Sequence, residues 1–158
     1  MDRPDALAAS PLLEGFTEVG LRILAGASAA RTVFPGTYAF RAGEPSNALS
    51  FVVKGRLQLL ARDGGAAIGE LAAGDTAGGL ALLSGPGEHL VSAMAVGEVE
   101  LLELSRDAFE ELRKARPRTC LKLTLALAAD LADRLREAKG PLREFLVWQI
   151  SKRQSEGR

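Results

Sequence analysis

The chain has 158 residues, of which 47% are hydrophobic, and its 20 Lys+Arg balance its 20 Asp+Glu to give a formal net charge of +0. This length suits one domain with a well-buried core, and the balanced charge disfavours nucleic acid as the main partner, because phosphate backbones require a concentrated basic face. The single histidine, His89, and the single cysteine, Cys120, supply neither an intramolecular disulfide nor the ligands of an ordinary zinc or iron site. We therefore expect no metal and no disulfide.

The N-terminal residues lack the features of an export signal. Asp2 and Asp5 stand where a positive segment and then an apolar core would be required. No apolar run in the sequence approaches the length of a membrane span. We expect a soluble, cytoplasmic protein with no membrane partner.

The first part of the chain has apolar residues at helical spacing, and the segments that follow are typical of short strands. Residues 11–30 fit one or two short helices, with Ser10 as a start signal before Pro11. From Arg31 onward, glycines separate short apolar segments that predict strands, and Asp63-Gly64-Gly65 is a good hairpin turn because glycine accepts positive φ. The predicted strands are 37–40, 49–53, 56–60, 67–71, 90–96 and 98–104. This pattern is typical of a β-sandwich or a small barrel.

A loop with a one-turn helix interrupts the strands, and helices end the chain. The loop covers residues 75–87, and its helix covers 80–83. Ser105 is expected to cap a helix over 106–116, and Pro117 to end it or start the next. The predicted divisions are a barrel domain over 11–118, a long amphipathic helix over 119–139, and a short helix with a polar tail over 141–158. Cys120 is expected to be a small buried residue near the start of the long helix.

Several spaced segments together resemble the cyclic nucleotide-binding domain of the catabolite-activator superfamily. They are residues 36–59, Gly74-Asp75, residues 78–83 and residues 99–105. The resemblance implies a mainly β fold with flanking helices: a double-stranded β-helix (jelly-roll) barrel, short N-terminal helices and a long C-terminal dimerisation helix. A cupin-like or unrelated jelly roll is the alternative fold.

The resemblance also implies a ligand site, in a phosphate-binding cassette whose pattern is Gly-Glu-Leu-Ala-Leu-Leu followed by Arg-x-Ala-Ser. In that cassette, backbone N–H groups and the arginine bind a cyclic phosphate, and the glutamate binds the ribose hydroxyl. Here Gly79 stands at the glutamate position and His89 at the arginine position. The resemblance therefore implies a degenerate site for a cyclic nucleotide or another small anionic ligand. The expected site residues are Gly78, Gly79, Leu80, Ala81, His89 and Ser92.

Each of the two departures from the cassette pattern has a second interpretation. Protonated His89 would partly replace the arginine, or His89 is a surface loop residue. Gly79 makes room for a ligand or a neighbouring side chain, or it marks the decay of an unused site. In either case we expect weak binding of cyclic AMP and cyclic GMP.

The long helix carries an apolar seam that is suited to pairing with a second copy of the chain. The seam residues, spaced by threes and fours, are Ala128, Leu131, Leu135, Ala138 and Leu142. Charged residues, among them Asp130 and Arg134, are expected to face outward. We favour a homodimer, and the alternative is that the seam packs on the barrel of its own chain. Near the C-terminus, Phe145, Leu146 and Trp148 form either a patch for a protein partner or a contact with the barrel.

These observations predict a non-enzymatic regulatory or sensor module in signal transduction. The alternative is a catabolite-activator-like transcription regulator that is truncated or lacks its DNA-binding domain. Residues 142–158 are too few for a helix-turn-helix domain, so we expect no direct binding of nucleic acid. An enzyme on a cupin-like barrel would need several inward His and carboxylate ligands, and we expect no catalytic residues and no certain cofactor.

Overall fold

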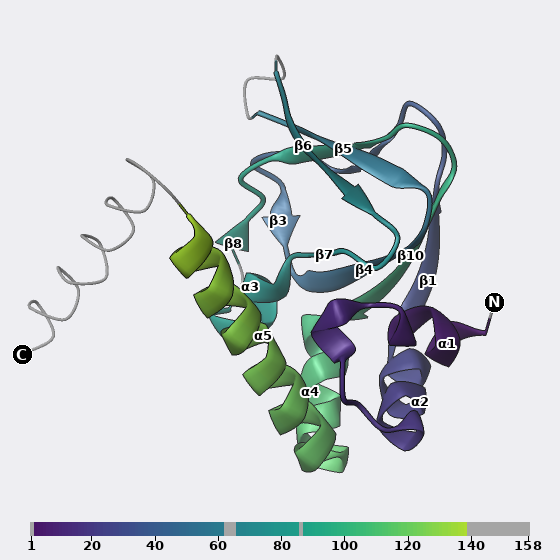
Figure 1. The fold of residues 1–158 in the computed structure, drawn as a ribbon, viewed down its shortest axis with the longest axis vertical. Coiled ribbons are helices and arrows are strands. Elements are labelled where there is room, and N and C mark those ends of the chain that lie inside the picture. Colours follow the sequence, from purple (N-terminus) through teal and green to yellow (C-terminus); the bar gives the residue numbers. More distant parts are fainter. Residues whose placement is uncertain (1, 62–65, 86, 139–158) are drawn as a thin grey trace, which may run out of the picture.

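The structure is a computed structural model that describes residues 2–61, 66–85 and 87–138. In it, a β-barrel sits above a group of helices (Figure 1). The strands form two four-stranded antiparallel sheets, in the orders β1-β10-β4-β7 and β2-β9-β5-β6, and the short pair β3-β8. The strands are β1 (Ala29–Val33), β2 (Tyr38–Phe40), β3 (Pro45–Ser46), β4 (Ala48–Lys54), β5 (Arg56–Leu60), β6 (Ala67–Ala72), β7 (Thr76–Ala77), β8 (Gly87–Glu88), β9 (Ser92–Ala95) and β10 (Val99–Ser105). The predicted jelly-roll fold is confirmed.

Strand β10 separates two hydrophobic cores. Successive side chains of a strand point to opposite faces, so Val99 and Leu101 pack inside the barrel, whereas Leu102 and Leu104 pack toward the helices. All four side chains are buried. The sheet that contains β10 is thus covered on both faces, by the second sheet and by the helical layer.

The helices are α1 (Arg3–Ala8), the 3-10 helix η1 (Pro11–Leu13), α2 (Glu18–Ala27), α3 (Gly79–Leu83), α4 (Arg106–Ala115) and α5 (Pro117–Glu137). The Ser105 side chain accepts a hydrogen bond from Ala108 N and caps α4, as predicted. Pro117 is the first residue of α5, where its missing N–H costs nothing. Cys120 is buried on the inner face of α5, which also confirms its prediction.

The predicted strands lie within a few residues of the observed ones. The structure adds β1, which precedes the first predicted strand, and three strands of two residues each: β3, β7 and β8. Helix α1, capped by Asp2, was not predicted. Strands β5 and β6 pair antiparallel around the predicted hairpin, although the turn at 63–65 lies outside the described residues. The predicted helix after Gly140 also lies outside them, as do Leu142, Phe145, Leu146 and Trp148. Within the described ranges, no helix combines the length and the apolar character needed to cross a membrane.

Candidate functional site

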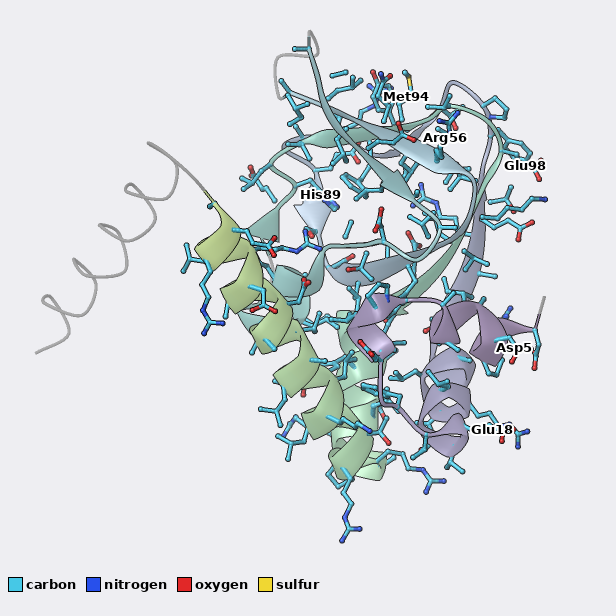
Figure 2. The ribbon with its side chains drawn as sticks, viewed as in Figure 1. Asp5, Glu18, Arg56, His89, Met94 and Glu98 are labelled. Carbon is cyan, nitrogen blue, oxygen red and sulfur yellow. The ribbon has the colours of Figure 1, made fainter. Side chains whose placement is uncertain are left out.

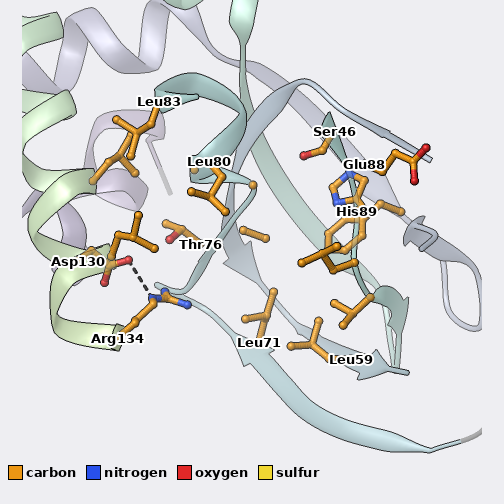
Figure 3. A pocket seen from close by; sticks show the side chains of 18 residues that line it. Ser46, Leu59, Leu71, Thr76, Leu80, Leu83, Glu88, His89, Asp130 and Arg134 are labelled. Atoms are coloured by element: carbon orange, nitrogen blue, oxygen red, sulfur yellow. Dashed lines mark hydrogen bonds and ion pairs between the residues drawn. The ribbon is translucent and has the colours of Figure 1, made fainter. Parts of the chain in front are cut away.

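A cavity of about 310 Å³ lies between α3, the middle of α5 and the barrel (Figure 3). Its apolar lining includes Phe40, Leu59, Leu71, Leu80, Leu127 and Leu131. Its polar lining consists of Ser46, Thr76, Glu88, His89, Asp130 and Arg134. The volume is at the lower end of the range for small-molecule sites, and mainly apolar walls with a few polar groups are typical of such sites.

Helix α3 begins at a position that only glycine can occupy. Gly78 has a φ of 84°, in the left-handed region, and a Cβ there would collide with the carbonyl oxygen of Ala48 on β4. The Gly78 carbonyl accepts a hydrogen bond from Ala81 N at 3.0 Å, which closes the first turn of α3. This backbone arrangement places Gly79 and Leu80 on the wall of the cavity.

Gly79 lies against α5. A Cβ at this position would be 2.9 Å from Cδ2 of Leu127, which is closer than real Cβ contacts. Leu127 is buried and belongs to the core that joins α5 to β4 and α4. The space that a Cβ at Gly79 would enter is thus taken by the end of the flexible Leu127 side chain.

His89 lies on the barrel side of the cavity, across from α5 (Figure 3). Its ring stacks on Phe40, with 4.0 Å between ring centroids and 9° between planes. Its backbone N–H donates to the Glu44 carbonyl at 2.9 Å, and its carbonyl accepts from Gly43 N at 2.8 Å. These bonds fix the loop that places the half-buried His89 on the cavity wall.

The electrostatics of His89 differ from those of an arginine. Burial lowers the pKa of the His89 imidazole below its ordinary value, and the carboxylates of Glu44 and Glu103 oppose that effect only in part. The lowered pKa favours the neutral imidazole. A neutral ring donates a hydrogen bond, but it does not supply the positive charge that a phosphate needs.

Four of the six predicted site residues meet at the cavity: Gly78, Gly79, Leu80 and His89. Ala81 and Ser92 are not among the lining residues, and both are buried. The Ala81 carbonyl accepts a hydrogen bond from Nη1 of Arg106 at 2.6 Å. The Ser92 hydroxyl oxygen accepts one from Ala42 N at 2.9 Å. Both groups thus have partners within the protein.

Asp130 and Arg134 of α5 line the cavity. Their side chains are still 40% and 59% exposed, so they reach solvent as predicted and also border the cavity. The side chains are joined by an ion pair, 2.9 Å from Arg134 Nε to Asp130 Oδ2. They lie on the cavity side because Leu127, one turn earlier, packs against Gly79 and so fixes the rotation of the helix. The i, i+4 spacing of Asp130 and Arg134 in the sequence indicated that they could form an ion pair. Spacing alone does not show which face of a helix lies against a cavity.

The outer face of α5 carries apolar side chains that do not pack on the barrel. Leu121 and Leu125 are 60% and 62% exposed, and Ala128 is exposed as well. Leu131 is 41% exposed and also lines the cavity, so this predicted seam residue belongs to both surfaces. Leu135 and Ala138 are half-buried, and Leu142 lies outside the described residues.

The charged groups of the described ranges do not form a metal centre, since no cluster of three or more His, Cys, Asp or Glu side chains there is arranged to hold an ion.

Comparisons with known proteins identify the class. The model of the cyclic nucleotide-binding domain matches residues 30–116, more than half of the chain. The chain therefore belongs to the cyclic nucleotide-binding domain family, a family of regulatory modules. No protein in the curated set matches it.

Solved structures include close matches to this fold. The N-terminal domain of a transcriptional regulator from Streptomyces coelicolor A3(2) is 24% identical, with a TM-score of 0.74, and the match covers 86% of this chain and 99% of that one. The catabolite activator protein of Thermus thermophilus is 30% identical, with a TM-score of 0.71, and the match covers 90% of this chain and 63% of that one. The sensor domain of the transcriptional regulator DNR from Pseudomonas aeruginosa is 25% identical, with a TM-score of 0.64, and the match covers 85% of this chain and 94% of that one.

Proposed function

We propose that this chain is a non-enzymatic sensor module that binds a small ligand in the cavity beside α3 and forms a homodimer through α5. The observation that carries this proposal is the double role of α5. Its inner face contributes Leu127, Leu131 and Arg134 to the cavity, and its outer face presents exposed leucines. A ligand that contacts the inner face would shift the same helix that pairs the two copies, which couples binding to assembly.

We further propose that the module recognises cyclic nucleotides weakly. The loss of a charge-assisted bond to phosphate costs about 1.5–3 kcal/mol, and the loss of the ribose acceptor costs about 1 kcal/mol. Together these losses lower the affinity by about two to three decades relative to an intact cassette. The neutral imidazole of His89 and the contact between Gly79 and Leu127 support this proposal.

Isothermal titration of the purified protein with cyclic AMP and cyclic GMP tests the weak recognition. We expect dissociation constants weaker than micromolar, and micromolar or tighter binding of either nucleotide would contradict the proposal. A matched set of variants then locates the cause. His89→Arg should restore part of the affinity, and Gly79→Glu should add to it only when Leu127→Ala provides space for the new side chain. Equal affinities across the set would show that the cassette no longer has the geometry of a phosphate site.

The second candidate is the sensor part of a catabolite-activator-like transcription regulator. Its support is the similarity to the N-terminal and sensor domains of such regulators. A gel-shift experiment with the intact protein at physiological salt tests direct DNA binding. A sequence-specific shift would favour this candidate, and its absence would show that these residues do not bind DNA on their own.

A further inference from the structure

The walls of the cavity are mainly hydrocarbon. Leu59 and Leu71 come from strands of one barrel sheet, and Leu80 comes from α3 (Figure 3). Leu127 and Leu131 close the cavity from α5. A molecule in this half-open space exchanges water for hydrocarbon over the surface that faces these walls, which favours apolar groups there and penalises a charge that finds no partner.

The barrel side adds an aromatic pair. The stacked rings of Phe40 and His89 both line the cavity, and the backbone bonds of His89 to Gly43 and Glu44 hold the pair in place. A fixed pair of stacked rings beside leucine side chains suits a flat ring system, which gains offset or edge contacts with little loss of conformational freedom.

The charges around the cavity are unfavourable for an anion. Among the described lining residues, the carboxylates of Glu88 and Asp130 stand against a single guanidinium, that of Arg134. Asp130 already pairs with Arg134 at 2.9 Å. Burial lowers the pKa of the His89 imidazole, which favours its neutral form. An anionic group would have to compete with Asp130 for Arg134. A cationic group would meet Arg134 and would lose its hydration against the leucines.

We propose that the ligand of this cavity is an uncharged, mainly apolar ring compound about the size of a bicyclic aromatic. This inference rests on the proposed function, since it takes the cavity as the ligand site of the sensor. The walls supply most of the affinity, and the Asp130–Arg134 pair supplies both an acceptor and a donor for a hydroxyl or carbonyl group at the α5 end.

A charge series on one ring system tests the ligand class. Naphthol, naphthoate and naphthylmethylammonium have similar shapes and are neutral, anionic and cationic at neutral pH. In isothermal titrations of the wild-type protein, naphthol should bind at least about tenfold more tightly than either charged probe. Tighter binding of naphthoate or of naphthylmethylammonium would overturn the neutral ligand class while leaving a ligand-binding sensor intact. Failure of all three probes to bind would overturn the ligand class and leave the proposed function to its own titrations.

Two pairs of variants place the binding in this cavity. Leu71→Trp fills the cavity and should weaken naphthol binding by about tenfold or more, whereas Ile68→Trp, at an exposed position on the same strand that does not line the cavity, should leave it unchanged. Asp130→Asn releases Arg134 from its ion pair and should strengthen naphthoate binding by about tenfold, whereas the double variant Asp130→Asn/Arg134→Gln should not. Equal effects within either pair would show that the probes bind elsewhere.

Discussion

Leu127 of α5 packs against the one position of α3, Gly79, at which the chain has no side chain: a Cβ there would be 2.9 Å from Leu127 Cδ2. The two residues join the helix that carries the exposed leucines to the helix that forms the cavity wall. Gly79 is thus part of a helix contact as well as a departure from the cassette pattern.

Gly79→Ala should destabilise the protein relative to a glycine substitution in open space. The added methyl gains up to about 1 kcal/mol of helix propensity, but overpacking against Leu127 costs about 1–3 kcal/mol. In Gly26→Ala, on α2, the new Cβ has nothing within 4 Å. This variant should only gain the stability that comes from helix propensity. Urea unfolding should therefore give Gly79→Ala a free energy of unfolding about 1–3 kcal/mol below that of Gly26→Ala. Equal values for the two variants would mean that Leu127 moves aside without cost.

A double-mutant cycle tests the same contact from the other side. Leu127→Ala alone should cost about 2–5 kcal/mol, as expected for a buried leucine. In the Gly79→Ala background the cost should be smaller by about 1 kcal/mol, because the overpacking has been relieved. Strict additivity would contradict a direct interaction between the two positions.

His89 should make the stability of the protein depend on pH below neutrality. Burial lowers the pKa of the folded imidazole below its ordinary value, against the partial opposition of Glu44 and Glu103, so the unfolded chain binds the proton more readily. The stabilisation due to neutral His89 is therefore present above pH of about 6.5 and is lost as the pH falls through the folded pKa. His89→Phe keeps a ring against Phe40 and removes the titrating group. Between pH of about 7.5 and 5, the free energy of unfolding should fall further for the wild type than for this variant. Parallel curves would contradict the prediction.

The outer face of α5 should control self-association. Leu125→Glu places a carboxylate at a 62% exposed position on the outer face of α5, one turn before the seam residue Ala128, where each dimer would bury two unpaired charges. In sedimentation equilibrium, the dimer dissociation constant should rise by about a hundredfold or more. Val19→Glu, at a 66% exposed position on α2, is the matched control and should not change it. A monomeric wild type, or equal effects of the two substitutions, would remove the homodimer from the proposal.

Arg106 should stabilise α3 from the start of α4. Its Nη1 donates to the Ala81 carbonyl at 2.6 Å in a partly buried position. Arg106→Ala removes this charge-assisted bond and should lower the free energy of unfolding by about 1–3 kcal/mol. Arg113→Ala breaks only an exposed pair with Glu110 and should cost less than about 1 kcal/mol. If the two substitutions cost the same, the bond to Ala81 contributes nothing beyond an ordinary surface contact.

Local patterns in the sequence predicted where the helices and strands lie better than how these elements pack against one another. The strands around residues 49–60 and 98–104 follow from short apolar segments between glycines, and the start of α4 follows from the Ser105 cap. The paired strands β3 and β8 have two residues each and carry no periodicity to detect. The position of Arg134 at the edge of the cavity depends on how α5 is rotated, and contacts distant in sequence, such as that of Leu127 with Gly79, determine this rotation.

Cys120 is the only thiol in the chain, it is buried on α5, and burial raises its pKa, so little of the reactive thiolate forms at neutral pH. A cysteine introduced at an exposed position of the same helix, such as Leu121→Cys, would therefore react selectively with a spin label or a fluorophore without removal of the native thiol. The distance between two such labels would follow the separation of the α5 helices in an assembled pair while ligand is added.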